Sequence, residues 1–427
     1  MNGGGYFTAQ NKVVPGAYIN FVSTTTARGG LSDRGVVAMA MSLGWGVEGS
    51  IIEVTSDVLA NPLATLGYSF DSEVLKPIRE VMKHARKLLL FRLDGNGTKA
   101  SNAYGTAKYA GVRGNDLKVV ISVNADAPSK YDVKTYLGTE LVDSQSAIED
   151  ATALKDNDFI AWNDSASLSV TAGTALNGGT NGAVNGSSHS AFLNLLESES
   201  FNVLVTDSTE TAIKSLYVAF TKRMVEEVGV KFQTVLFERA ADAEYIINET
   251  TAADLVYWVA GAEAGCAINQ SITNLTYDGE YEITKKYTQA ELAEAIDAGE
   301  FVFHKVGSVH KVLTDINSLV SVTEAKGDDF KNNQTVRVIN QIGNDVAALF
   351  NGSYLGKVQN DEAGRASFWG ALVGYFNDLL QLRAIQNFDA NTDVVVEAGQ
   401  TPEAVLVTTQ ITPVSCMEKL YMVVYVN

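Results

Sequence analysis

Leu420-Tyr-Met-Val-Val-Tyr-Val-Asn427 ends the chain, and the seven residues before the asparagine are all apolar or aromatic. In an extended strand, successive side chains point to opposite faces. One face would carry Leu420, Met422, Val424 and Val426, and the other Tyr421, Val423 and Tyr425. Such a strand needs a cover on both sides, and an exposed apolar edge promotes aggregation. The stretch therefore predicts a strand that completes either a sheet of its own domain or a sheet of another molecule.

The region before this stretch supplies a sheet with too few strands. Two helical segments, 334–350 and 362–386, precede two short β-type runs, Asp393–Glu397 and Ala404–Ile411. Two strands make a poor sheet by themselves. We therefore predict an α+β C-terminal domain over 328–415, followed by an arm strand over 416–427. The predicted acceptor residues are Asp393, Val394, Val395, Val396, Val405, Leu406, Val407 and Thr409.

The chain begins much as it ends. A Gly- and Asn-rich stretch, 1–13, is followed by a strand-like run and then by a polar linker, 23–30. We predict that 1–30 forms an N-terminal arm with its linker. An edge strand of the first domain is an alternative that the pattern leaves open. The run consists of Ala17, Tyr18, Ile19, Asn20, Phe21 and Val22.

The first half of the chain contains two regions with different sequence patterns. Residues 31–94 combine strand-like runs with an amphipathic helix over 71–86, which predicts a small α/β domain. Residues 95–180 are rich in Gly, Asn, Ser and Thr with short alternating runs, among them 118–123, 130–136 and 167–171. This second pattern predicts a small β-rich domain.

Beyond a small polar stretch, 171–190, strands and helices alternate. Strand-like runs at 201–205 and 232–237 flank a helix predicted over 209–228, and an apolar helix is predicted over 252–268. Alternation of this kind predicts a mostly parallel sheet covered by helices. We assign 181–327 to an α/β core domain, so the fold class expected for the whole chain is α/β multidomain.

Composition excludes several classes of protein. The 427 residues are 46% hydrophobic and 19% charged, as in folded proteins. The net charge of −18 argues against a partner nucleic acid and against binding to a membrane surface. The N-terminus lacks a signal pattern, and no run approaches 18 apolar residues, so we expect synthesis in a cytoplasm without classical export.

The motifs that could indicate a catalytic or metal-binding site match only in part. Asp94-Gly-Asn-Gly-Thr98 resembles the start of a calcium loop, but Lys99 and Gly105 stand where Gly and Glu are required. The glycines of 173–186 lack the Lys-Ser/Thr of a phosphate loop. We therefore expect no cofactor, no metal and no catalytic site. The other groups considered are His84, His189, His304, His310, Cys266, Glu226-Glu227 and the pair Glu280 and Glu282, most simply core or surface residues.

The order of short motifs along the chain resembles contractile tail sheath proteins of phages and of phage-tail-like bacteriocins of Gram-positive bacteria. The motifs of the first two thirds are Pro15–Asn20, Ala107–Asn115, Gly178–Gly182, Ala260–Ser271 and Leu275–Tyr277. The motifs of the last third are Asp315–Leu319, Asn333–Asn340 with Asp345, Tyr354–Asn360, Gly364-Arg365 and Met417–Tyr421. Ala110 stands where the family commonly has Pro, and 31–94 is generic.

This resemblance implies a non-enzymatic polymer. Family members form six-membered rings stacked helically around an inner tail tube, together with baseplate and tail terminator proteins, in the host cytoplasm. A trigger then shortens and widens the lattice, and the tube is driven through a cell envelope. The terminal arms of one subunit add strands to the last domain of a neighbour, and the β-rich domain faces outward.

Two hypotheses follow for this chain. The runs 17–22 and 420–426 are the donor strands, bending at linkers 23–30 and 410–416, and the two C-terminal runs are the acceptors. The nearly charge-balanced last domain faces the tube, with Lys357, Arg365 and Glu362 as candidate tube-facing residues. A cytosolic α/β enzyme, with pocket residues after Val205 and Phe237, is the alternative from another class. A surface-layer or other lattice protein is a third alternative. It would require an export signal, and the N-terminus shows no such pattern.

Overall fold

The structure, a computed structural model, describes residues 30–426. Its contacts divide the chain into two compact units. The larger contains Ser32–Asn344 and the segment from Pro413 onward, and the smaller is built on Asp345–Thr412. Helix α8 (Asn333–Ser353) spans the point of division. The predicted N-terminal donor strand, 17–22, lies outside the described residues.

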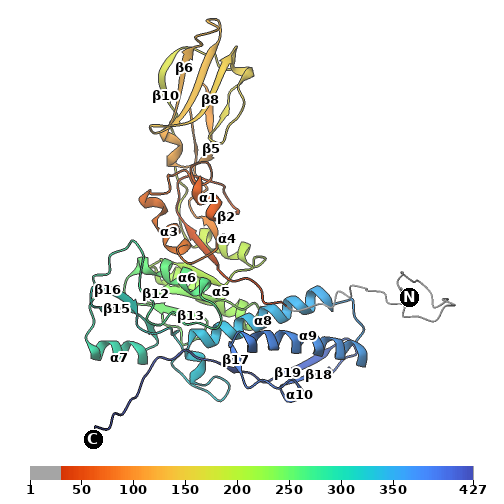
Figure 1. Ribbon diagram of the computed structural model, residues 1–427. Helices are drawn as coiled ribbons and strands as arrows, with labels where there is room; N and C mark the ends of the chain where they lie inside the picture. Colours follow the sequence, from red (N-terminus) through yellow and green to blue (C-terminus); the bar gives the residue numbers. More distant parts are fainter. Residues whose placement is uncertain (1–29, 427) are drawn as a thin grey trace, which may run out of the picture. The chain divides into compact units, whose positions relative to one another are not determined.

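A seven-stranded mixed sheet organises the larger unit (Figure 1). Its strand order is β14-β13-β12-β11-β1-β3-β2, and every pairing is parallel except that of β2 with β3. The strands are β1 (Val36–Met41), β2 (Ile51–Val54), β3 (Lys87–Arg92), β11 (Val203–Thr206), β12 (Gln233–Phe237), β13 (Ile246–Glu249) and β14 (Glu300–Phe301).

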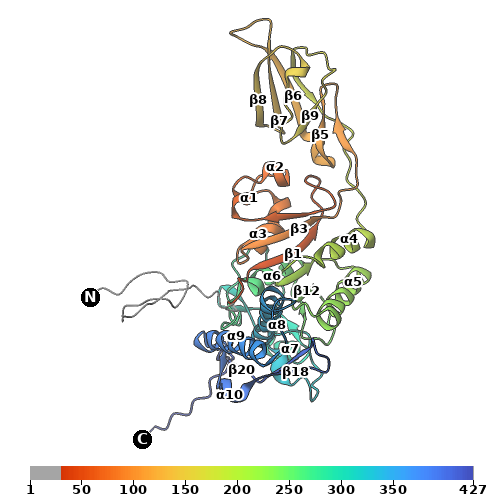
Figure 2. The ribbon, with the colours of Figure 1, turned by 90° about the vertical axis from the view of Figure 1, so that its right-hand side faces the viewer.

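Alternate residues of these strands fill two separate cores. Val37 and Met39 of β1 face a core that includes α3 (Lys76–Met82) and α6 (Val256–Gly265). Val36, Ala38 and Ala40 face the opposite core, built with α4 (Gly186–Leu196) and α5 (Thr211–Lys222), which lie side by side in Figure 2. A parallel sheet covered on both faces explains why its strands are apolar on both sides.

The sheet joins two regions predicted as separate domains, 31–94 and 181–327. Strand β1 lies between β3, from 31–94, and β11, from 181–327. More than 100 residues separate β3 from β11 in the chain. Local periodicity identifies the strands, whereas their order depends on contacts far apart in sequence.

Helix α6 approaches α3 unusually closely because of its glycines. A Cβ added at Gly261 would lie 2.3 Å from the carbonyl oxygen of Val81, and one at Gly265 would lie 2.1 Å from that of His84. Only glycine fits at such a distance from backbone. The small residues of 260–265 therefore set the spacing between the two helices.

Two sheets form the β-rich region of 95–180. One has the order β10-β6-β7-β8 and the other β4-β5-β9. Trp45 and Leu117 lie in their shared core, so a residue from the first part of the chain contributes to it. The expected strand at 167–171 is wrong, since β10 begins only at Thr171. The strands are β4 (Lys99–Ser101), β5 (Gly105–Ala110), β6 (Leu117–Val123), β7 (Tyr131–Leu137), β8 (Glu140–Ile148), β9 (Ile160–Trp162) and β10 (Thr171–Ala175).

Short elements complete the larger unit. The helix predicted over 209–228 is α5 followed by a π-helical turn, Arg223–Val228, which ends at Gly229 with φ of 93°. Strands β15 and β16 form an antiparallel hairpin. The remaining elements are α1 (Ser56–Ala60), α2 (Leu63–Leu66), α7 (Gln289–Asp297), β15 (Phe303–Val306), β16 (Val309–Val312) and five 3-10 turns (Glu73–Leu75, Val112–Asp116, Ala151–Ala153, Ala253–Leu255, Asp328–Lys331).

The smaller unit packs a helix on a hairpin. Helix α9 (Glu362–Gln381) covers the antiparallel pair β18 (Val394–Ala398) and β19 (Val405–Thr409). It ends five residues earlier than the predicted 362–386 because Leu382 closes it and Arg383 adopts φ of 60°. The short elements are β17 (Ile385–Gln386), α10 (Ala390–Asp393) and β20 (Thr412–Pro413).

Candidate assembly surface

The terminal stretch pairs with no strand among residues 30–426. From Leu420 to Val426 the residues have no regular secondary structure, and each is between 68% and 91% exposed. Seven consecutive apolar or aromatic side chains are thus exposed to water. Large exposed apolar patches mark binding surfaces in soluble proteins. We call this stretch, 420–426, the terminal segment.

The residues just before the terminal segment are held on the larger unit. The Gln334 side-chain amide donates from Nε2 to the carbonyl oxygen of Val414 at 2.9 Å. Its Oε1 accepts a hydrogen bond from the Cys416 N–H, also at 2.9 Å. The amide carries a donor and an acceptor, so it pairs with the main chain as a neighbouring strand would. We call residues 414–418 the root of the arm.

Glu418 provides a second attachment of the root. Its carboxylate accepts hydrogen bonds from Thr273 Oγ1 at 2.7 Å and from Thr314 Oγ1 at 3.3 Å. Thr273 Oγ1 in turn accepts from the Asp315 N–H at 2.9 Å. The expected flexible linker, 410–416, is therefore partly fixed, since both Val414 and Cys416 are bonded. The first residue beyond these attachments is Lys419.

A buried ionic cluster lies beneath the root. Arg337, on α8, donates from Nη2 to Glu263 at 2.5 Å and to Asp315 at 3.1 Å, and all three side chains are at most 1% exposed. Burial and the neighbouring Asp315 raise the pKa of Glu263 to about 8. Although burial opposes it, Arg337 lowers the pKa of Asp315. One positive and one negative charge then remain buried, since Glu263 keeps its proton at neutral pH.

The predicted acceptor strands form a hairpin with two free edges. Residues of β18 and β19 pair in register from Val394 with Thr409 to Ala398 with Val405. In the part of the chain that the structure describes, no third strand joins this sheet. The assignment of Asp393 to the strand is wrong, because it is the last residue of α10. Its carbonyl oxygen nevertheless accepts from the Gln410 N–H at 2.9 Å and extends the ladder.

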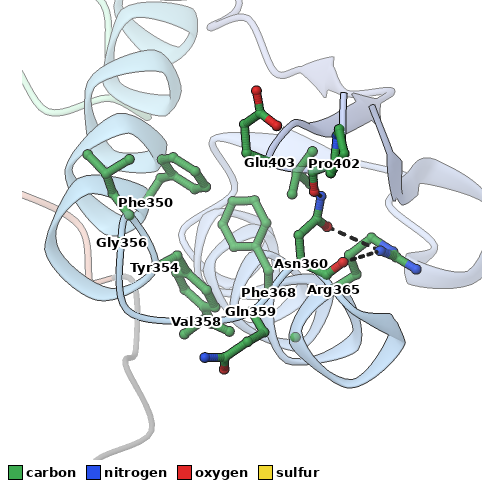
Figure 3. Close-up of a pocket in the computed structure, with 13 residues that line it drawn as sticks. Phe350, Tyr354, Gly356, Val358, Gln359, Asn360, Arg365, Phe368, Pro402 and Glu403 are labelled. Atoms are coloured by element: carbon green, nitrogen blue, oxygen red, sulfur yellow. Dashed lines mark hydrogen bonds between the residues drawn. The ribbon is translucent and has the colours of Figure 1, made fainter. Parts of the chain in front are cut away.

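A cleft of about 490 Å³ opens beside the hairpin (Figure 3). Phe350, Tyr354 and Phe368 form its floor, with the Tyr354 and Phe368 rings 4.7 Å apart and the Phe350 and Phe368 rings 5.6 Å apart. Val405, the first residue of β19, also lines it. The cleft is therefore an aromatic groove beside the turn of the hairpin and the first residue of β19.

The loop 354–360 holds this cleft in shape. Asn360 Nδ2 donates to the carbonyl oxygens of Pro402 at 2.8 Å and of Ala404 at 2.7 Å. Arg365 Nη1 donates to the Asn360 carbonyl oxygen at 3.0 Å and to its Oδ1 at 3.1 Å, as the dashed lines in Figure 3 show. A Cβ at Gly364 would lie 2.0 Å from the Gln359 carbonyl oxygen, so this position requires glycine. The rim is thus built by the hydrogen bonds of Asn360.

The candidate tube-facing residues have different surroundings. Glu362 is exposed in the first turn of α9. Lys357 is exposed, and its ammonium group bonds the carbonyl oxygen of Gly352. Arg365 is partly buried at the cleft rim and is engaged with Asn360. All three lie on or near the loop that precedes α9.

The other groups singled out in the sequence have structural partners. Asp94 is buried, pairs with Arg92 at 2.8 Å and accepts from the N–H groups of Leu43 and Gly44. Burial raises the pKa of the Cys266 thiol to about 11, so this thiol is protonated at neutral pH. His304 and His310 lie on paired strands but each faces a lysine in the register. Within residues 30–426, His, Cys, Asp and Glu side chains do not gather into a group of three that could hold a metal ion.

A polar crevice of about 630 Å³ lies where the alternative enzyme hypothesis predicts one. The loop after β11 contributes Asp207 and Ser208, and His189 and Tyr257 complete part of the wall. Burial lowers the pKa of His189, and its Nδ1 lies 3.0 Å from the Tyr217 hydroxyl oxygen. The histidine is therefore a neutral ring in a core contact. The second predicted loop, after Phe237, does not line this crevice.

Sequence reasoning missed the root and the cleft. Asn333–Asn340, Tyr354–Asn360 and Met417–Tyr421 were singled out only as motifs, without roles for Gln334, Asn360 or Glu418. Nothing in the local pattern distinguishes Gln334 from the other polar residues of 333–345. Within residues 30–426, each helix is too short or too polar to cross a membrane.

Four domain families of tail sheath proteins match consecutive parts of the chain. They are the tail sheath protein Gp18 domain III N-terminal region (34–93), the phage tail sheath protein beta-sandwich domain (95–181), the phage tail sheath protein central domain (182–318) and the phage tail sheath C-terminal domain (325–427). Together they follow the order of the motifs that carry the resemblance.

Whole-chain relatives agree with these matches. The phage-like element PBSX protein XkdK of Bacillus subtilis strain 168 is 31% identical over 472 residues, covering 100% of both chains. The solved sheath tail protein of Desulfitobacterium hafniense is 35% identical with a TM-score of 0.84, covering 95% of this chain and 99% of that one. The anti-feeding prophage helical sheath in its contracted state shares the fold, with 11% identity, a TM-score of 0.56 and coverage of 96% and 98%. The chain therefore belongs to the phage tail sheath protein family.

Proposed function

We propose that this chain is the non-enzymatic subunit of a contractile tail sheath, which stacks as six-membered rings around an inner tube and contracts to drive that tube through a cell envelope. Membership of the sheath family supports the structural role. The observation that carries the assembly mechanism is the exposed terminal segment combined with a hairpin that has two free edges. Each provides what the other lacks.

Strand donation joins the subunits. The terminal segment, and at the other end residues 17–22, add to β18 and β19 of neighbours. Burying about six large apolar side chains would contribute on the order of 10 kcal/mol before ordering costs. About five ladder hydrogen bonds would add roughly 1 kcal/mol each. Backbone pairing also fixes the register, which suits a joint that must survive a change of lattice.

Contraction then proceeds by movement of rigid bodies. The root stays on its own body through Gln334 and Glu418, so the arm bends at Lys419 while its strand stays paired in the neighbour. New body-to-body contacts supply the energy, as in other interface switches. The proposed bodies are the predicted domains 31–94 and 181–327 moving together, because they share one sheet, the predicted domain 95–180, and the predicted domain 328–415.

The proposed partners are further copies of this chain, the inner tube protein, and the baseplate and terminator proteins. Lys357, Glu362 and Arg365 face the tube in this proposal. Reversing the charges of both Lys357 and Arg365 should reduce the number of tube-filled extended tails. Assembly takes place in the host cytoplasm, and the product is a virion tail or a released phage-tail-like particle of the R-type bacteriocin kind.

Truncation tests this function directly. Removing residues 420–427 leaves the root intact, so the protein should remain folded and monomeric but form no sheaths by negative-stain electron microscopy. Full-length protein imaged in parallel should form tubes with a wide lumen. Normal sheaths from the truncated chain, or compact particles from the full chain, would contradict the proposal.

A further inference from the structure

We propose that the cleft beside the hairpin binds the ring of Tyr425 from the terminal segment of a second copy of this chain. The inference rests on the proposed strand donation and adds where the side chains of the donated strand go. It names Tyr425 of a second copy of the chain as the residue that fills the cleft.

The chemistry of the cleft suits a tyrosine. Its floor consists of three aromatic rings, Phe350, Tyr354 and Phe368, and aromatic pairs are stabilised by edge and offset contacts. Gln359, Asn360 and Arg365 supply amide and guanidinium groups at the rim, where a phenol hydroxyl can find a partner. A buried tyrosine needs such a polar neighbour for its hydroxyl group.

Strand geometry brings one face of the terminal segment to the cleft. A strand added to the free edge of β19 runs past Val405, which lines the cleft. Alternate side chains of that strand point to the same face. The face that carries Tyr421, Val423 and Tyr425 holds both tyrosines of the segment, and the segment itself has no charged residue. An uncharged strand matches an uncharged aromatic floor.

We assign Tyr425, and not Tyr421, to the cleft because it reaches farther from the root. Glu418 is fixed on the donor's own body, and an extended chain advances about 3.3 Å per residue. Tyr421 therefore reaches only about 10 Å beyond the fixed point, whereas Tyr425 reaches about 23 Å. In its own chain Tyr425 is 87% exposed, so it fills no site there.

Site-specific photocross-linking in the full chain tests this placement. A benzophenone amino acid replaces Tyr425 in one sample and Met422, on the opposite strand face, in a control sample. After irradiation of assembled sheaths made from isotopically light and heavy subunits, mass spectrometry maps the linked peptides. Cross-links from position 425 should join light to heavy chains and map to 350–368 or 402–405, whereas those from position 422 should map elsewhere.

Two substitutions provide an independent readout. Tyr425→Ser should raise the concentration needed for sheath assembly by about tenfold or more, and Tyr421→Ser should raise it less. Leu355→Asp, at a cleft residue that is 58% exposed and thus tolerant of a polar side chain, should reproduce the Tyr425→Ser defect. A larger defect from Tyr421→Ser, or cross-links from 425 outside the cleft, overturns the placement.

These outcomes separate the inference from the proposed function. If removal of 420–427 abolishes sheaths while position 425 cross-links elsewhere, strand donation stands and the cleft assignment is wrong. If the truncated chain still forms sheaths, both are wrong.

Discussion

Gln334 donates a hydrogen bond from its side-chain amide to the carbonyl oxygen of Val414 at 2.9 Å, across 80 residues of chain. The same amide accepts from the Cys416 N–H. Gln334 is almost completely buried, so its amide depends on these partners. The contact fixes Val414 and Cys416 on the larger unit, just before the terminal segment.

Removing the amide should free the root. In the monomer, Gln334→Leu should increase hydrogen exchange of the amides of 414–418 by about thirtyfold, since two hydrogen bonds of roughly 1 kcal/mol each are lost. Exchange measured by mass spectrometry on terminal peptides gives the answer. Gln381→Leu, at an exposed position of α9, should leave these amides unchanged. Equal protection in both variants would show that the root is held by other contacts.

Glu263 should make stability depend on pH. Its pKa is raised to about 8 by burial and by Asp315, whereas an unfolded glutamic acid titrates near 4.3. Between these values the folded state binds more protons than the unfolded state, so the free energy of unfolding falls as pH rises, by about 1.4 kcal/mol per pH unit for one group.

Glu263→Gln mimics the protonated carboxyl and should remove that slope. Urea unfolding at pH 5.5 and at pH 7.5 should show a smaller difference for Glu263→Gln than for the natural chain. Glu294→Gln, at an exposed position of α7, is the matched control and should keep the natural difference. If both variants retain it, Glu263 is already ionised in the folded protein.

The glycine contact of α6 should be intolerant of a methyl group. Gly261→Ala places a Cβ 2.3 Å from the Val81 carbonyl oxygen, which α3 must move to accommodate, and overpacking of this kind costs about 1–3 kcal/mol. Gly370→Ala, on α9 with open space around its Cα, should instead stabilise its helix by about 1 kcal/mol. Thermal unfolding of the two variants should shift in opposite directions.

The two thiols should react at different rates. Cys416 is exposed, whereas burial raises the pKa of Cys266 to about 11 and leaves little thiolate at neutral pH. A maleimide at pH 7 should label one thiol quickly and the second much more slowly. Cys416→Ser should abolish the fast phase, and Cys266→Ala should leave it intact. A fast phase that survives Cys416→Ser would contradict this assignment.

The sequence by itself determined many of the local elements and the protein family. The alternating side chains of 117–123 and 131–137, and the nearly continuous run of apolar and small residues along 256–265, are visible in the local sequence. The apolar residues on both faces of the terminal segment likewise predict a strand that pairs outside its own domain. The motifs around these elements were sufficient to identify the sheath family.

Tertiary structure alone decided what those elements contact. The position of β1 between β3 and β11, the entry of Trp45 into the core of the β-rich region, and the pairing of Gln334 with Val414 each join residues far apart in the chain. Periodicity indicates which side chains are buried, but it does not identify the residues that they pack against. Those residues belong to segments far away in the chain, which supply the complementary shape and the hydrogen-bond partners. The sequence therefore predicted an arm, and only the fold showed that Gln334 binds Val414 and Cys416 and that a cleft lies beside the β18–β19 hairpin.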